Sequence, residues 1–167
     1  MGNKRVYLMC GPAGGGKSTW IRNNAKPGVS AHISRDRIRF KMVKEDEYYF
    51  SREDEVYMEF TRQIMKAITC EWVDEVYVDA THLTKKSREK LVREIDNVCI
   101  LFDLIAVIVK PELEKCIEQN AQRSGREFVP ETVIRNMYES FQHPLNDDLY
   151  YKYIIENDKI VKGEVEN

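Results

Sequence analysis

The sequence lacks several features that would define a class of protein. Its longest apolar run, residues 104–109, is far shorter than the roughly 20 residues that a membrane-spanning helix needs. With 26 Lys and Arg against 28 Asp and Glu, it has no basic excess, which argues against a histone-like coat of nucleic acid but leaves local basic patches open. Its four cysteines lack metal or redox spacing, so we expect reduced thiols in a cytoplasmic protein, bacterial or from a phage-infected host. Without repeats or low-complexity tracts, the 167 residues predict one domain, residues 1–167, with no membrane partner.

A glycine-rich run stands between a short apolar segment, residues 6–10, and a helix-compatible segment, residues 18–25. The run fits the phosphate-loop pattern of glycine, four residues, then Gly-Lys-Ser. Glycines let backbone N–H groups turn toward phosphates, and the helix N-terminus favours an anion. We predict that Lys17 reaches the β- and γ-phosphates of ATP and that the Ser18 hydroxyl ligates Mg²⁺, with guanine nucleotides left open as donors. The expected nucleotide-binding residues are Gly11, Ala13, Gly14, Gly15, Gly16, Lys17, Ser18 and Thr19.

Strand-like and helix-like segments alternate along the chain. Strands are expected at residues 5–10, 31–34, 75–79, 104–110 and 151–155, and helices at 51–72, 84–96, 112–122 and 130–141. This alternation is typical of a parallel sheet with helices on both faces, so we predict an α/β three-layer sandwich of about five strands. The polar tail, residues 159–167, is expected to fray.

The second expected strand ends at Ser34-Arg35-Asp36-Arg37-Ile38-Arg39. In an open parallel sheet, ligands bind beyond the carboxyl ends of the strands, so Asp36 and Arg39 are expected at the same edge as the glycine run. Asp36 suits the general base of a kinase, and Arg39 could grip an acceptor phosphate. The alternative is a solvated helix start with Asp36 only as a cap.

The third strand ends in Asp79, followed by Thr81 and His82. A carboxylate there usually orients the Mg²⁺ shell or the acceptor. His82 has no partner at metal-ligand spacing. The first turn of the next helix carries Lys85, Lys86 and Arg88; positive charge opposes the helix dipole there, which predicts either an anion such as a nucleic-acid phosphate or ordinary surface lysines.

A glycine hinge near Gly125 separates the last two helices and carries Arg123 and Arg126. A mobile arginine that closes over transferring phosphates can supply much of a kinase's rate. We predict a lid at about residues 119–130, with Arg123 as the catalytic arginine and Arg126 as a second candidate that contacts the nucleotide. The alternative for both is a solvent-exposed loop arginine.

Together these clusters resemble the 5′-kinase domain of the phage polynucleotide kinase family. The most specific part runs from Val129-Pro130 through Phe141, and the resemblance covers residues from about 5 to about 155. It implies a P-loop kinase-like fold with strand order 2-3-1-4-5 and transfer of the γ-phosphate of ATP to a 5′-hydroxyl end of DNA or RNA. Its implied roles are Asp36 as general base, Arg39 on the acceptor's 3′-phosphate, Asp79, Thr81 and His82 at the acceptor site, and Arg123 on the donor phosphates.

The sequence departs from the family in two places. It contains no Asp-x-Asp-x-Thr motif, so we predict no 3′-phosphatase activity, and His82 stands where the family has Asn. Two other functions fit the residues: a kinase for a small-molecule hydroxyl (a sugar, antibiotic or nucleotide-sugar) and an ATP-binding module without transfer. DNA or RNA preference and oligomeric state stay open.

Overall fold

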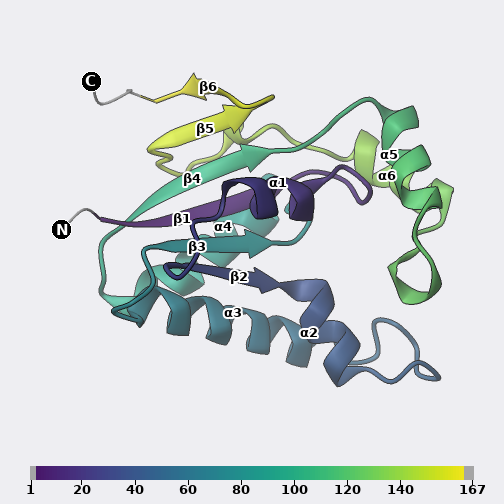
Figure 1. Ribbon diagram of the computed structural model, residues 1–167, viewed down its shortest axis with the longest axis horizontal. Helices are drawn as coiled ribbons and strands as arrows, with labels where there is room; N and C mark the ends of the chain where they lie inside the picture. The colour runs from purple at the N-terminus through teal and green to yellow at the C-terminus, as the bar shows by residue number, and fades with distance from the viewer. Residues whose placement is uncertain (1–2, 164–167) are drawn as a thin grey trace.

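The computed structural model describes residues 3–163 and is built around one six-stranded sheet (Figure 1). Helices and strands alternate, as the sequence predicts. Their bounds are β1 Lys4–Cys10, α1 Lys17–Asn24, β2 Ser30–Ser34, α2 Arg35–Met42, α3 Glu53–Thr69, β3 Glu75–Asp79, α4 Lys85–Ile95, β4 Phe102–Ile108, α5 Leu113–Ala121, α6 Glu131–Glu139, β5 Tyr153–Glu156 and β6 Lys159–Lys162, with 3₁₀ turns η1 Asp96–Val98, η2 Gly125–Glu127 and η3 Pro144–Asn146.

The strand order is β2-β3-β1-β4-β5-β6, and the first five strands are parallel. This confirms the predicted α/β class and adds one antiparallel strand at the edge. The expectation that residues 159–162 fray is wrong, because β6 pairs with β5 across a two-residue turn. Asn157 and Asp158 both have positive φ there, 52° and 59°, which short polar side chains tolerate in hairpin turns. Residues 164–167, the rest of the predicted tail, lie outside the described residues.

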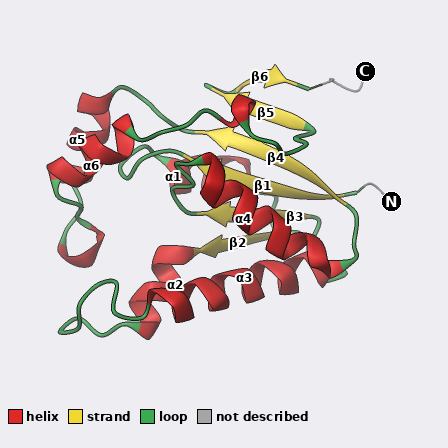
Figure 2. Ribbon diagram, turned by 180° about the vertical axis from the view of Figure 1, so that it is seen from behind, coloured by secondary structure: helices red, strands yellow, loops and turns green. Residues whose placement is uncertain are grey.

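The sheet separates two apolar layers. Alternate β1 residues point to opposite faces, so Val6 and Leu8 pack under α3 and α4, whereas Met9 packs against Ile21 of α1. Figure 2 shows α3 and α4 on one face, and Figure 1 shows α1 on the other. α3 presents an apolar stripe to the sheet, since Val56, Phe60, Ile64, Ala67 and Ile68 are all buried.

The carboxyl ends of the parallel strands converge at one edge of the sheet, where α2 begins and where α5 and α6 lie (Figure 1). Thr84 caps α4, since its side chain accepts a hydrogen bond from the Ser87 amide. Within residues 3–163, no helix has both the length and the apolar character to cross a membrane.

Candidate active site

The glycine run forms the loop between β1 and α1. Gly14 has φ +74°, and a Cβ there would stand 2.2 Å from the Cys116 carbonyl oxygen in α5, so both conformation and space require glycine. Gly11 approaches Val109 as closely, with a Cβ 2.1 Å from its carbonyl oxygen. Ala13 is buried in a small cluster with Cys116. The loop is therefore fixed by packing against the end of β4 and against α5.

Lys17 opens α1 and folds back over the loop. Its Nζ donates to the carbonyl oxygens of Gly11 at 3.0 Å and Pro12 at 2.8 Å. Burial lowers the pKa of Lys17, and the charges of Asp79 and Asp36 act against that lowering. Arg123 is also close enough to lower it. Asp79, Asp36 and Arg123, predicted for the site from distant parts of the sequence, thus all lie close enough to act on Lys17.

Asp79 lies at the end of β3 and is 7% exposed. Its Oδ2 accepts hydrogen bonds from Ser18 Oγ at 2.9 Å and from His32 Nε2 at 2.8 Å. Burial alone would raise the pKa of Asp79, but the His32 hydrogen bond, the Lys17 charge and the Ser18 hydrogen bond together hold it below its ordinary value. Asp79 therefore stays ionised beside the phosphate loop.

Ser18 and Asp79 offer the oxygen ligands that Mg²⁺ prefers. No group of three metal-binding His, Cys, Asp or Glu side chains occurs within residues 3–163. The site therefore fits an ion that takes its remaining ligands from water and nucleotide phosphates, as Mg²⁺ usually does. His32 was not predicted from the sequence. The feature that could have indicated it is an imidazole side chain within a strand, two residues before Ser34.

Asp36 lies in the first turn of α2, which Ser34 caps by accepting from the Arg37 amide at 3.3 Å. The Asp36 carboxylate is 64% exposed, and its Oδ1 accepts from Arg39 at 2.5 Å and from the Tyr49 hydroxyl at 3.1 Å. The largely exposed carboxylate thus has both of these hydrogen bonds on Oδ1 and none on Oδ2 from residues 3–163, which is compatible with a proton acceptor.

Arg39 is 5% exposed and already engaged by carboxylates. Besides Asp36, it binds Glu53 in α3, with Nη2 2.9 Å from both carboxylate oxygens. No pattern in the sequence pointed to Glu53. The predicted grip on an acceptor phosphate stays a prediction, and an arriving phosphate would have to share the guanidinium with Glu53.

Thr81 and His82 tie the loop after β3 to β1. The Thr81 carbonyl accepts from the Gly11 amide at 2.9 Å, and His82 Nδ1 lies 2.7 Å from the Met9 carbonyl oxygen. His82 is 6% exposed, and burial lowers its pKa to about 4, so the ring is neutral. Both residues line a cavity of about 380 Å³ beside the start of α2, where an acceptor is expected, but the imidazole is engaged by the backbone.

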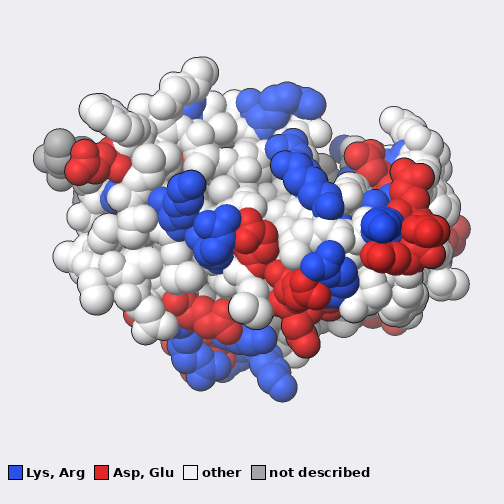
Figure 3. Space-filling view, turned by 90° about the horizontal axis from the view of Figure 1, so that it is seen from below, with Lys and Arg blue, Asp and Glu red and all other residues white. Residues whose placement is uncertain are grey.

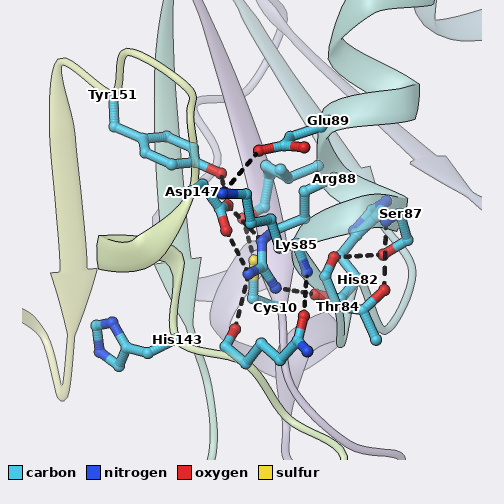
Figure 4. A network of polar contacts seen from close by, with 12 residues as sticks. Cys10, His82, Thr84, Lys85, Ser87, Arg88, Glu89, His143, Asp147 and Tyr151 are labelled. Carbon is cyan, nitrogen blue, oxygen red and sulfur yellow. Dashed lines mark hydrogen bonds and ion pairs between the residues drawn. The ribbon is translucent and has the colours of Figure 1, made fainter.

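The basic first turn of α4 meets carboxylates of the same chain (Figure 4). Arg88 is fully buried and forms a bidentate pair with Asp147, at 2.6 and 2.7 Å. It also donates to the carbonyls of His82 and Gln142, both at 2.7 Å. Lys85 pairs with Asp148. For Arg88 and Lys85, the anion is therefore a carboxylate of the same chain.

The two lid arginines face different parts of the structure. Arg123 lines a second cavity, of about 470 Å³, together with glycines of the phosphate loop, Thr19 and Trp20. Arg126 does not line that cavity and instead contacts carbonyl oxygens of Phe40 and Val43. Of the two arginines, only Arg123 thus lies at the cavity beside the phosphate loop in this structure.

The parallel sheet, the glycine loop and Asp79 define a P-loop kinase-like fold, which implies ATP binding. Residues 6–144 match the family model described as an AAA domain, and the chain belongs to that family. A comparison with curated protein sequences found no match.

Solved structures show the same fold. A chain of the Pnkp1/Rnl/Hen1 RNA repair complex superposes with a TM-score of 0.67 at 16% identity, over 84% of this chain and 44% of that one, so this chain spans less than half of it. A fungal RNA kinase gives a TM-score of 0.65 at 19% identity, over 96% of this chain and 76% of that one. A gluconokinase from Sinorhizobium meliloti 1021 gives 0.55 at 15% identity, over 93% and 85%.

Proposed function

We propose that this chain is an ATP-dependent kinase that transfers the γ-phosphate to the 5′-hydroxyl end of DNA or RNA. The observation that carries the proposal is that Asp36, just after β2, and the glycine loop, just after β1, lie at the same carboxyl edge of the sheet, where the Asp36 charge opposes the lowering of the Lys17 pKa by burial. This arrangement supports a proton acceptor placed beside a phosphate-binding loop. The RNA kinase and RNA repair structures with this fold support a polynucleotide end as acceptor.

In the proposed reaction the acceptor's O–H proton passes to the Asp36 carboxylate while its oxygen bonds to the γ-phosphorus. The bond from that phosphorus to the bridging oxygen breaks, and ADP keeps the electron pair. Lys17 and Arg123 neutralise charge on the phosphate oxygens. Ser18 and Asp79 would hold Mg²⁺, which supplies further charge neutralisation when bound.

The experiment offers γ-labelled ATP, Mg²⁺ and 5′-hydroxyl oligonucleotides of both sugars to the wild type and to Asp36→Asn. We expect 5′-end labelling that drops roughly 10²-fold or more in the variant while ATP affinity is kept. Asp96→Asn, at an exposed position after α4, is the matched control and should match wild type. No labelling by wild type at any salt concentration, or an equal loss of ATP affinity in Asp36→Asn, would contradict the proposal.

A second candidate is a kinase for a small-molecule hydroxyl. The face shown in Figure 3 carries basic and acidic side chains side by side, without one broad basic area, and the gluconokinase shares the fold. A polyanionic acceptor would show a KM that rises steeply with salt because its phosphates release counterions on binding. A salt-insensitive acceptor KM would favour the small molecule.

A further inference from the structure

The lid segment, residues 119–130, leads from the end of α5 to the start of α6 and is closed at its base. Asn120, 2% exposed at the end of α5, donates from its amide to the Val129 carbonyl at 2.7 Å. The Val129 amide donates back to Asn120 Oδ1 at 3.0 Å. This pair brings the two ends of the segment together. The position of the lid tip, η2 Gly125–Glu127, therefore depends on the contacts that the tip itself makes.

The tip rests on α2 through Arg126. Its Nη2 donates to the Val43 carbonyl at 2.9 Å and its Nη1 to the Phe40 carbonyl at 3.3 Å. These carbonyls belong to the C-terminal end of α2, where helical carbonyls lack partners and the dipole favours a cation. The guanidinium carbon also lies 4.8 Å from the centre of the Phe40 ring, a stacking distance. Arginine suits all three contacts, and lysine cannot make them together.

Contacts continue from Arg126 to the proposed base. The Phe40 ring meets Tyr49 edge-on, with ring centres 6.3 Å apart. The Tyr49 hydroxyl donates to Asp36 at 3.1 Å and accepts from Arg39 at 3.2 Å. On the other side of the tip, Arg123 lies three residues before Arg126 and lines the phosphate-loop cavity. Arg126 is thus connected through its neighbours both to the proposed base and to the donor cavity.

We propose that Arg126 is a positioning residue that docks the lid tip on α2, so that Arg123 is placed at the donor cavity and Tyr49 against Asp36. This goes beyond the proposed function and rests on it only for the kinetic consequence. It also differs from the sequence expectation, in which Arg126 contacts the nucleotide itself.

Hydrogen exchange of the full-length protein without substrates tests the docking directly. In Arg126→Met we expect amides of residues 119–130 and 44–53 to exchange at least roughly tenfold faster, because two charge-assisted hydrogen bonds are lost. Amides of β1 and β3 should be unchanged. Arg126→Lys should fall between, and Arg93→Met, which removes an exposed arginine with no side-chain partner among residues 3–163, should match wild type. Unchanged exchange in the lid, or equal acceleration in the strands, would overturn the docking role.

Kinetics separate positioning from nucleotide binding. Docking predicts that Arg126→Met lowers kcat for transfer roughly tenfold and leaves the KM for ATP unchanged, because the side chain does not line the donor cavity. A raised KM for ATP with unchanged lid exchange would return Arg126 to the nucleotide and overturn the proposal. If wild type labels no acceptor, the proposed function fails, and the exchange result still decides whether Arg126 docks the lid.

Discussion

His82 makes stability depend on pH in a way that one substitution should remove. Its ring is buried, with Nδ1 donating to the Met9 carbonyl at 2.7 Å and the Phe60 ring stacked 6.3 Å away. Burial is the main cause that lowers its pKa from 6.5 to about 4, and the Met9 hydrogen bond acts in the opposite direction. Between about pH 4 and pH 6.5, the His82 ring is therefore neutral in the folded protein and protonated in the unfolded chain.

The direction follows from proton counts. As pH falls below about 6.5, the unfolded chain gains a proton at His82 that the folded state does not, so the free energy of unfolding decreases. The decrease approaches about 1.4 kcal/mol per pH unit and stops near pH 4, where the folded ring also protonates. The total is about 3 kcal/mol, a large part of a typical domain's stability.

The test compares wild type with His82→Asn. Asparagine tolerates the backbone at this position, where φ is +42°, and its amide can still donate to Met9 without titrating. Urea unfolding at several pH values between about 4.5 and 7.5 gives the difference in unfolding free energy between the two proteins. Carboxylates cancel in that difference, so it should change in favour of the variant by about 1 kcal/mol per unit below about pH 6. A difference that is constant over this range would refute the reasoning.

Three further predictions concern charge and space. Lys17→Ala should abolish transfer through lost phosphate stabilisation; single-turnover rates within tenfold of wild type would contradict its role. Arg88→Met should cost about 3–5 kcal/mol in urea unfolding, because Asp147 is left buried without its partner, and a cost below about 1 kcal/mol would show that the pair is dispensable. Gly14→Ala should weaken nucleotide binding in calorimetry, since its Cβ meets a carbonyl at 2.2 Å; Gly28→Ala, with φ +81° but open space, is the control and should bind normally.

The positions of five strands follow from local sequence, whereas their order, 2-3-1-4-5, was implied by the resemblance to the phage polynucleotide kinase family; the first five strands have that order. Parallel strands buried on both faces read as apolar runs, and residues 75–79 and 104–108 are such runs. The sixth strand was not predicted, because Lys159–Lys162 is polar and exposed. Only the turn at Asn157 and Asp158, which brings it beside β5, makes it a strand.

The candidate site divides in the same way. The sequence by itself determined which residue types can cradle phosphate, because the glycine loop needs a local backbone path that few sequences allow. It also determined that Asp79 ends a strand and that Asp36 follows one. These are short-range properties, fixed by residues next to one another in the chain.

Only the tertiary structure determined which carboxylate or carbonyl group each arginine contacts. Arg39 is engaged by Glu53, Arg88 by Asp147, and Arg126 by two carbonyls at the end of α2, and each partner lies at least ten residues away in sequence. The sequence does not distinguish an arginine that binds a phosphate ligand from one that pairs with a group of the same chain. The difference arises when packing removes water from the guanidinium, because a buried charge is tolerated only where the fold supplies its counter-charge or acceptors.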